Sequence, residues 1–191
     1  EEMDYTCRTA AAELFGVEDE SNVVFTGNAT HGLNIAIHTL VQSGSRVVIT
    51  GYEHNAVTRP LHAIPNVTLT VLDTPPFQPD RTIEELKAAL SHGADVVICN
   101  HVSNVFGCIQ PVEEMAALCA EAGVPFVLDA SQSAGMVPVD MTALGAAFAA
   151  MPGHKGLYGP QGTGLLLCGA EPAPLLRGGT GSQSLLQEMP R

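Results

Sequence analysis

The chain is poor in basic and aromatic residues. Its 191 residues include 8 Lys and Arg against 20 Asp and Glu, which gives a net charge of −12, and there is no Trp. A nucleic-acid surface needs clustered Lys and Arg to neutralise phosphates, so this balance argues against a nucleic-acid partner. An acidic excess is otherwise typical of a solvated surface, and an anionic ligand here requires locally arranged hydrogen-bond donors.

The sequence also lacks an apolar run long enough to span a bilayer. Residues 1–5 are not a basic region followed by an apolar one, so we expect no secretory signal, no membrane partner and a cytoplasmic location. The first residue is Glu rather than Met, which favours a chain that begins inside a longer protein.

The cysteines form no metal or disulfide pattern. Their number is odd and none are in CxxC spacing. We therefore expect reduced, buried thiols and no metal site. The five are Cys7, Cys99, Cys108, Cys119 and Cys168. Cys108, four residues after Asn104, comes closest to a catalytic position, but a packing role is favoured and none is predicted to be catalytic.

Strand-like apolar runs alternate with helical patterns along the chain. Expected strands cover residues 22–26, 46–50, 67–72, 95–99, 124–128 and 164–168, and expected helices cover 29–41, 82–91 and 112–121. The second helix is predicted to open with a capping box formed by Thr82 and Glu85. This alternation predicts one α/β domain over residues 1–191, with three layers and a mainly parallel sheet between helices.

Polar residues follow several of the apolar runs. Ligands of open α/β sheets bind beyond the carboxyl ends of the strands. Because each of these residues comes shortly after a different run, we expect them to gather at one edge of the sheet. They are Thr30, His54, Asn104, Asp129 and Lys155.

Lys155 is the residue of this group with the most specific chemistry. The only other lysine, Lys87, lies three residues after Glu84 in an expected helix, where a solvated role is usual. Lys155 lies in the glycine-rich segment 153–164, after the apolar stretch 146–150. A lysine that forms a Schiff base needs a rigid setting within reach of a carbonyl, so Lys155 is the candidate, with a surface charge as the alternative.

The other residues each have two interpretations. A carboxylate at the end of a buried strand needs a cationic or hydrogen-bonded partner. For Asp129 that partner is either the protonated ring nitrogen of a ligand, which Gln132 could also reach, or the backbone N–H groups of a helix that Asp129 caps. The turn 27–30 leads into a helix start, where backbone N–H groups and the Thr30 hydroxyl favour an anion, although such turns are common without one. His54 is either a ligand or a structural histidine.

These segments together resemble the class V aminotransferase family, pyridoxal 5′-phosphate enzymes of fold type I, and most closely its cysteine desulfurase branch. The similar segments run in order through Thr-His-Gly-Leu-Asn (30–34), Glu-His-Asn (53–55), Val-Ser-Asn-Val-Phe-Gly (102–107), Asp-Ala-Ser-Gln (129–132), Gly-His-Lys (153–155) and Gly-Gly-Thr-Gly-Ser (178–182). The resemblance covers nearly the whole chain and implies the large, cofactor-binding domain of such an enzyme.

The resemblance implies a role for each site residue. Lys155 would hold pyridoxal phosphate as an internal aldimine and then carry protons, while His54 would stack on the ring and assist proton transfer. Asp129 would pair with the ring nitrogen and Gln132 with the phenolic oxygen. Asn104 would lie near the ring oxygen or the substrate carboxylate. The phosphate would be bound by Ala29, Thr30, His154 and, across a homodimer interface, Thr180.

The chain departs from the family pattern in two respects. Pro152 stands where relatives often have a serine whose hydroxyl meets the phosphate. Family members are also much longer, so an N-terminal segment and the C-terminal small domain are expected to be absent. With that small domain the substrate-carboxylate arginine and the nucleophilic cysteine would lie outside the chain, and the fragment itself would be inactive.

The resemblance implies a cysteine desulfurase, which converts L-cysteine to L-alanine and leaves a persulfide for a sulfur-acceptor protein. Two alternatives remain open at this point. One keeps the cofactor but changes the reaction, as in a class V aminotransferase or a selenocysteine lyase. The other is a non-catalytic module with the same fold, or an inert fragment.

Overall fold

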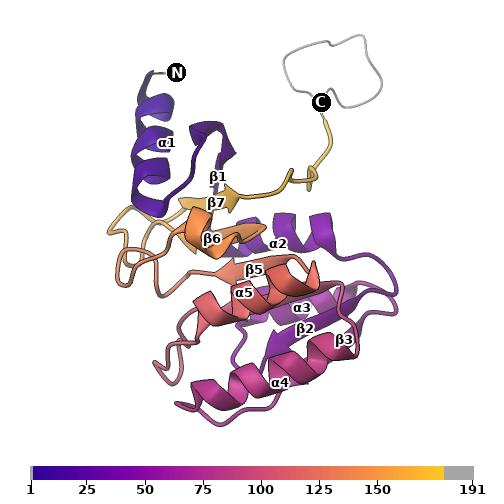
Figure 1. Cartoon of the computed structure of the whole chain (residues 1–191). Helices are drawn as coiled ribbons and strands as arrows, with labels where there is room; N and C mark the ends of the chain where they lie inside the picture. The colour runs from indigo at the N-terminus through magenta and orange to yellow at the C-terminus, as the bar shows by residue number, and fades with distance from the viewer. Residues whose placement is uncertain (1, 179–191) are drawn as a thin grey trace.

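Seven strands form one sheet in the computed structural model, which describes residues 2–178 (Figure 1). Their order is β1-β7-β6-β5-β4-β2-β3. Within the described residues only β7 runs against the others, pairing antiparallel with β1 and β6. The predicted mainly parallel sheet is thus confirmed. The strands are β1 (Val23–Thr26), β2 (Arg46–Thr50), β3 (Thr68–Leu72), β4 (Val96–Asn100), β5 (Phe126–Asp129), β6 (Phe148–Pro152) and β7 (Gly164–Cys168).

Helices cover both faces of the sheet, as the three-layer prediction required (Figure 1). One face carries α2 (Ala29–Leu40) and α3 (Asn55–Ala63). The other carries α1 (Glu2–Phe15), α4 (Pro79–Ser91), α5 (Val112–Ala122) and the short α6 (Met141–Leu144). A single 3₁₀ turn, η1 (Glu20–Asn22), precedes β1. No helix within residues 2–178 has both the length and the apolar character needed to cross a bilayer.

The central strands are buried on both faces because each faces a helix layer on either side. Successive side chains of a strand point to opposite faces. In β5, Val127 therefore packs into the core under α2 and α3, while Phe126 and Leu128 pack into the core under α4 and α5. Strands buried in this way need apolar residues at every position, which explains the continuous runs in the sequence.

The predicted capping box is wrong. Helix α4 begins at Pro79, three residues before Thr82, and its N-cap Gln78 makes no side-chain capping bond. Proline suits the first helical turn because its missing N–H has no intrahelical acceptor there. Thr82 is buried instead, and its hydroxyl lies 3.1 Å from that of Thr74.

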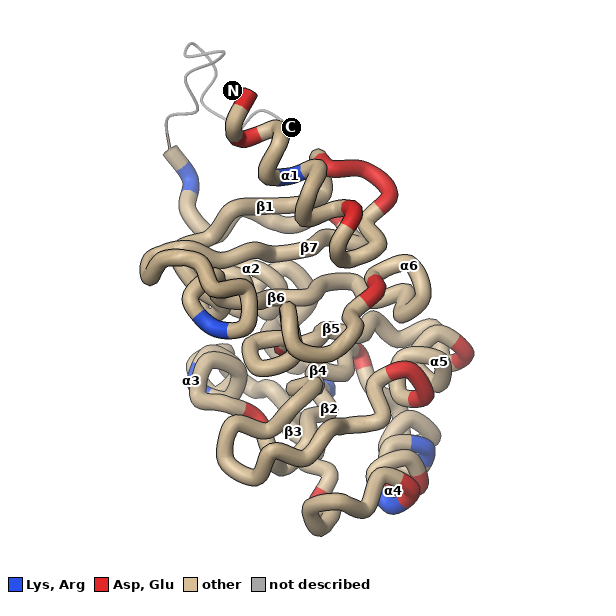
Figure 2. The backbone as a smooth tube through the Cα atoms, turned by 90° about the vertical axis from the view of Figure 1, so that its left-hand side faces the viewer, with Lys and Arg blue, Asp and Glu red and all other residues tan. Residues whose placement is uncertain are grey.

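Acidic positions spread over the outer helices, including α1, α4 and α5, with few basic positions among them (Figure 2). Most of these charges are solvated, and the exposed Arg46–Asp95 ion pair at 2.9 Å ties the start of β2 to the loop before β4. The excess negative charge thus lies mainly on the helical exterior, as expected of a solvated surface.

The core under α2 supplies a direct test of the packing. Replacing the fully buried Leu33 by Ala should lower the free energy of unfolding by about 3 kcal/mol, because a buried cavity replaces the side chain. The matched control is Leu176→Ala, at a leucine that is 82% exposed, with an expected loss below about 0.5 kcal/mol. Urea denaturation of both variants measures the difference, and equal losses would contradict this core assignment.

Candidate active site

A pocket lies at the edge of the sheet where β4, β5 and β6 end. The last residue of each of these strands lines it, together with the first turn of α2, the N-cap of α3 and the loop after β6. The sequence placed the site at this edge, and every predicted site residue within residues 2–178 lines the pocket. The lining residues are Asn28, Ala29, Thr30, His54, Ala56, Asn100, Val102, Asn104, Asp129, Ser131, Gln132, Pro152, His154 and Lys155.

The first turn of α2 presents unpaired backbone donors to the pocket. Asn28 is the N-cap, and its side-chain oxygen accepts the N–H of His31 at 2.9 Å. The N–H groups of Ala29 and Thr30, the first two helical residues, have no intrahelical acceptors. Together with the positive end of the helix dipole and the Thr30 hydroxyl, they form a site suited to an anion such as a phosphate.

Asp129 lies at the carboxyl end of β5 and is 4% exposed. Its Oδ1 accepts the N–H of Ser131 at 2.9 Å, which makes a turn rather than the alternative of a helix N-cap. Among the described residues no cationic side chain pairs with it. A buried carboxylate with one hydrogen bond favours a cationic ligand group, since burial of an unpaired charge is costly.

Lys155 projects from the loop after β6. The Lys155 carbonyl accepts the N–H of Tyr158 at 2.9 Å, and the Gly153 N–H donates to Thr163 at 2.8 Å, so the loop is an ordered turn. The next residue, Gly156, lies so close to the Ala134 carbonyl that a Cβ would come within 2.3 Å of its oxygen. Glycine at this position therefore lets the lysine loop approach the turn that follows Asp129 at the end of β5.

His54 makes a structural contact and also lies at the pocket. It is the N-cap of α3, where its Nδ1 accepts the N–H of Ala56 at 3.1 Å, and it also lines the pocket. Because Nδ1 is an acceptor, the ring proton of neutral His54 lies on Nε2. A ring held in one tautomer by its backbone contact is well suited to contact a ligand through the other nitrogen.

Asn104 and Gln132 reach the pocket from two further turns. Asn104 follows Ser103, whose hydroxyl accepts the N–H groups of Val105 and Phe106 at 3.3 Å each. Gln132 is half-buried in the turn after Asp129. His154 lies beside Lys155, and Thr180 lies outside the described residues.

The sequence did not single out Asn100 or Glu53, two polar residues that meet at this edge. Asn100 is the last residue of β4, one position beyond the predicted strand end, and lines the pocket. Glu53 lies beneath it: its Oε1 accepts the Asn100 N–H at 3.0 Å, while its Oε2 is buried without a hydrogen-bond partner. The signal for Asn100 was a polar residue closing an apolar run, whereas the partner of Glu53 is distant in sequence.

No cysteine lines the pocket among the described residues. The expected burial is confirmed for four cysteines and wrong for Cys7, which is exposed on α1. Burial raises the pKa of Cys119 to about 12 and that of Cys168 to about 11, so both thiols are protonated at neutral pH. All five are free thiols, and Cys108 is a packing residue, as predicted.

The fold is that of an α/β protein with a pocket at the carboxyl ends of its parallel strands. More particularly, the chain belongs to the class V aminotransferase family, because the family model described as Aminotransferase class-V matches residues 2–188. Members of this family depend on pyridoxal 5′-phosphate.

Individual relatives agree with this assignment. A probable cysteine desulfurase of Mycolicibacterium paratuberculosis is 33% identical over 83% of this chain and 24% of its own length. The apo structure of a cysteine desulfurase from Thermococcus onnurineus NA1 is 31% identical, with a TM-score of 0.77, over 86% of this chain and 42% of that one. A structure described as SspA in complex with cysteine is 26% identical, with a TM-score of 0.79, over 92% of this chain and 53% of that one. The chain therefore spans about half or less of the length of these relatives.

The residues present fit the family's cofactor. Pyridoxal phosphate has a phosphate, a ring nitrogen that can be protonated and an aldehyde. The pocket has a matching group for each: an anion site at α2, a buried carboxylate and a primary amine. Pro152 lines the pocket without an N–H or hydroxyl to donate, so one family phosphate donor is missing, as the sequence indicated.

The order of the α2 N-cap, on which the anion site depends, can be tested without a ligand. Asn28→Ala should lower the free energy of unfolding by about 1 kcal/mol, because it leaves the His31 N–H without its acceptor. The matched control is Gln78→Ala, at an N-cap whose side chain makes no capping bond, and this variant should lose much less. Thermal denaturation of the two variants compares them, and equal losses would argue against an ordered cap at the pocket.

Proposed function

We propose that this chain is the cofactor-binding large domain of a cysteine desulfurase, which converts L-cysteine to L-alanine and a protein persulfide. The observation that carries the proposal is that Lys155 and Asp129, one suited to an aldehyde and the other to a ring nitrogen, line the same pocket. The choice of cysteine rests on the relatives, two of which are named cysteine desulfurases while a third was determined with cysteine.

The proposed cofactor contacts follow from the donor set. The Ala29 and Thr30 N–H groups, the Thr30 hydroxyl and His154 would bind the phosphate. Asp129 would hold the ring nitrogen in its protonated form, because a cation beside a buried carboxylate is stabilised. Gln132 would donate to the phenolic oxygen. Thr180 would bind the phosphate of a partner subunit.

The bound cofactor supplies an electron sink for the substrate's α-carbon. Lys155 Nζ would hold the cofactor's aldehyde, and its amine would move a proton at the substrate's α-carbon. His54, with its proton on Nε2, assists that transfer, and Asn104 orients the substrate carboxylate or the ring oxygen. Both roles require side chains held in place before substrate arrives, and the capping bond of His54 supports this for the imidazole.

The sulfur step needs groups that this pocket does not contain. A thiolate must attack the substrate sulfur, so that the S–S bond forms as the C–S bond breaks and the Cβ takes up a proton. The described pocket residues include no cysteine and no arginine. We propose that the nucleophilic cysteine and the arginine for the substrate carboxylate come from another part of the full protein.

The setting of the enzyme is part of the same proposal. A phosphate site that includes Thr180 of a second subunit implies a homodimer. Free thiols at all five cysteines favour the reducing cytoplasm. A persulfide product implies a sulfur-acceptor protein.

The two lysines of the chain allow a matched test of cofactor binding. Pyridoxal phosphate added to the wild-type chain should produce a visible absorbance band that borohydride reduction makes covalent. Lys155→Ala should abolish the covalent adduct, because no other pocket residue carries a primary amine. Lys87→Ala, in α4 and remote from the pocket, should leave it unchanged. Mass spectrometry locates the adduct, and attachment at Lys87 or no attachment would contradict the proposal.

The reaction itself is tested in the full-length natural protein that contains this chain. L-cysteine should yield equimolar alanine and, with a thiol reductant, sulfide, and Lys155→Ala should abolish both products. Chromatography of the amino acids measures alanine directly. Transfer of an amino group to a keto acid without sulfide release would instead identify an aminotransferase, and activity confined to selenocysteine would identify a selenocysteine lyase.

A further inference from the structure

Glu53, which the proposed reaction does not use, connects two strand ends beneath the pocket. Its Oε1 accepts the Thr50 hydroxyl at 2.6 Å and the Asn100 N–H at 3.0 Å. Thr50 ends β2 and Asn100 ends β4. A single carboxyl oxygen therefore joins two neighbouring strands at the point where both reach the pocket edge.

Asn100 completes a reciprocal connection. Its side-chain Nδ2 donates to the Tyr52 carbonyl at 2.8 Å, so β4 also binds the turn that carries Glu53. Tyr52 is itself held, since its hydroxyl donates to the Thr74 carbonyl and its ring meets that of Phe106 edge-on at 5.8 Å. The next residue after this turn is His54, which is the N-cap of α3 and lines the pocket.

We propose that Glu53 is a positioning residue, which holds His54 and Asn100 at the pocket by joining the turn after β2 to the end of β4. The importance of the two residues it holds rests on the proposed function. The connection itself is independent of it, because it consists of contacts within this chain.

The second carboxyl oxygen of Glu53 indicates the protonation state in which Glu53 joins the two strands. Oε2 is buried without a hydrogen-bond partner, and an ionised oxygen in that position would be costly. Burial, and then the negative charge of nearby Asp129, raise the pKa of Glu53 to about 8, against the pull of the Thr50 and Asn100 donors. The buried Oε2 and the raised pKa both favour the neutral acid at neutral pH, with Oε1 as the acceptor.

Burial raises the pKa of two neighbouring groups above their usual values, Cys99 on β4 and Tyr52 on the same turn. The other titratable neighbours, Asp129 on β5 and His54 on the same turn, are present in both wild type and Glu53→Gln and so do not distinguish the two proteins. Because the folded pKa of Glu53 lies above the unfolded value of 4.5, its contribution to stability is full below pH 4.5 and is lost as the pH rises through about 8. Glutamine, neutral with one acceptor oxygen, reproduces the acid without this loss.

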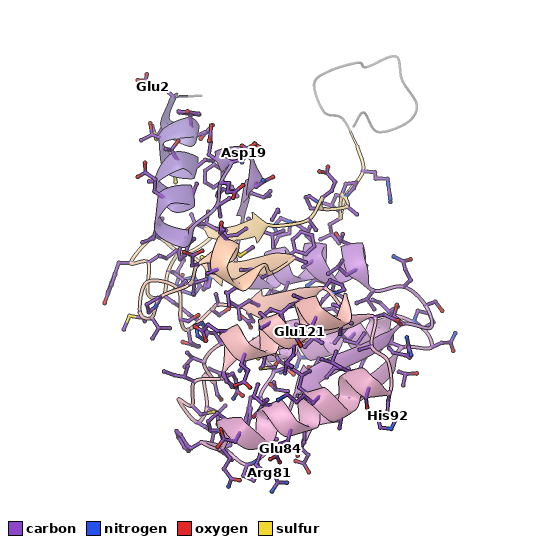
Figure 3. The ribbon with its side chains drawn as sticks, in the orientation of Figure 1. Glu2, Asp19, Arg81, Glu84, His92 and Glu121 are labelled. Atoms are coloured by element: carbon purple, nitrogen blue, oxygen red, sulfur yellow. The ribbon has the colours of Figure 1, made fainter. Side chains whose placement is uncertain are left out.

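The experiment compares Glu53→Gln with Glu53→Ala in the chain without cofactor. A negative result would therefore contradict the positioning role of Glu53 without bearing on the proposed function. The readout is the NMR signals of the His54 ring and the Asn100 amides. Glu53→Gln should leave both at wild-type positions, and Glu53→Ala should shift both. The matched control is Glu84→Ala, at an exposed residue of α4, which should shift neither (Figure 3). Thr50→Val removes one of the two donors and should shift His54 even if Glu53→Ala does not fold.

A pH series separates positioning by the neutral acid from simple space filling. The difference in melting temperature between wild type and Glu53→Gln should decline from about pH 5 to about pH 8, because only the wild type carries the titrating group. A flat difference, a shift of His54 in Glu53→Gln as large as in Glu53→Ala, or unshifted signals in Thr50→Val would each overturn the proposal.

Discussion

The parallel pairing of β4, β5 and β6 is the constraint on which the site depends. In register, Asn100 pairs with Asp129 and Asp129 pairs with Ala150, two residues before the end of β6. The chain leaves all three strands at one edge, so the turns after them converge on one volume. A slip of one residue in β5 would move Asp129 to the opposite face, because side chains alternate along a strand. Asp129 is the only polar residue of β5 and comes after three residues that pack into the two cores, so the packing of those residues also places the carboxylate at the strand end.

The helix layer over this edge contributes through close contact rather than through charge. Gly32 in the first turns of α2 lies against β6 and β7, where a Cβ would stand 3.2 Å from that of Ala150. A glycine here lets the start of the helix pack closely against the sheet. The N–H groups of Ala29 and Thr30 therefore lie near the strand ends. The anion site and the carboxylate site are built by different elements, and the sheet is what they share.

The sequence was informative where local pattern and tertiary role coincide. The apolar runs predicted β2 and β7 at their observed bounds, because the buried residues of each strand form one continuous apolar run. Lys155 was identifiable because the chain has one other lysine and that one suits a surface helix. Thr82 misled for the opposite reason: its local pattern is that of a cap, but tertiary burial pairs it with Thr74 and the helix starts at Pro79.

Local sequence pattern could not identify the roles of Glu53 and Asn100, because the hydrogen bond between them joins positions 47 residues apart. A glutamate before a histidine in a loop carries no sign that its carboxyl group is buried between two strands. Likewise Asn100 appeared only as the polar residue after an apolar run. Such residues become visible only when the strand order places β2 beside β4, and strand order is the part of an α/β fold that periodicity does not encode.

The charges around the pocket explain how a protein of net charge −12 can hold a phosphorylated ligand. The donors at α2 are backbone N–H groups, which carry no formal charge and depend on the helix rather than on basic side chains. Lys155 is the only Lys or Arg side chain among the described pocket residues. Asp129 lies on β5 and the anion site on α2, so a cationic group and an anionic group of one ligand would meet different elements of the pocket. The raised pKa of Glu53 favours its neutral form at pH 7, which limits the negative charge that competes with Asp129 for a cationic group.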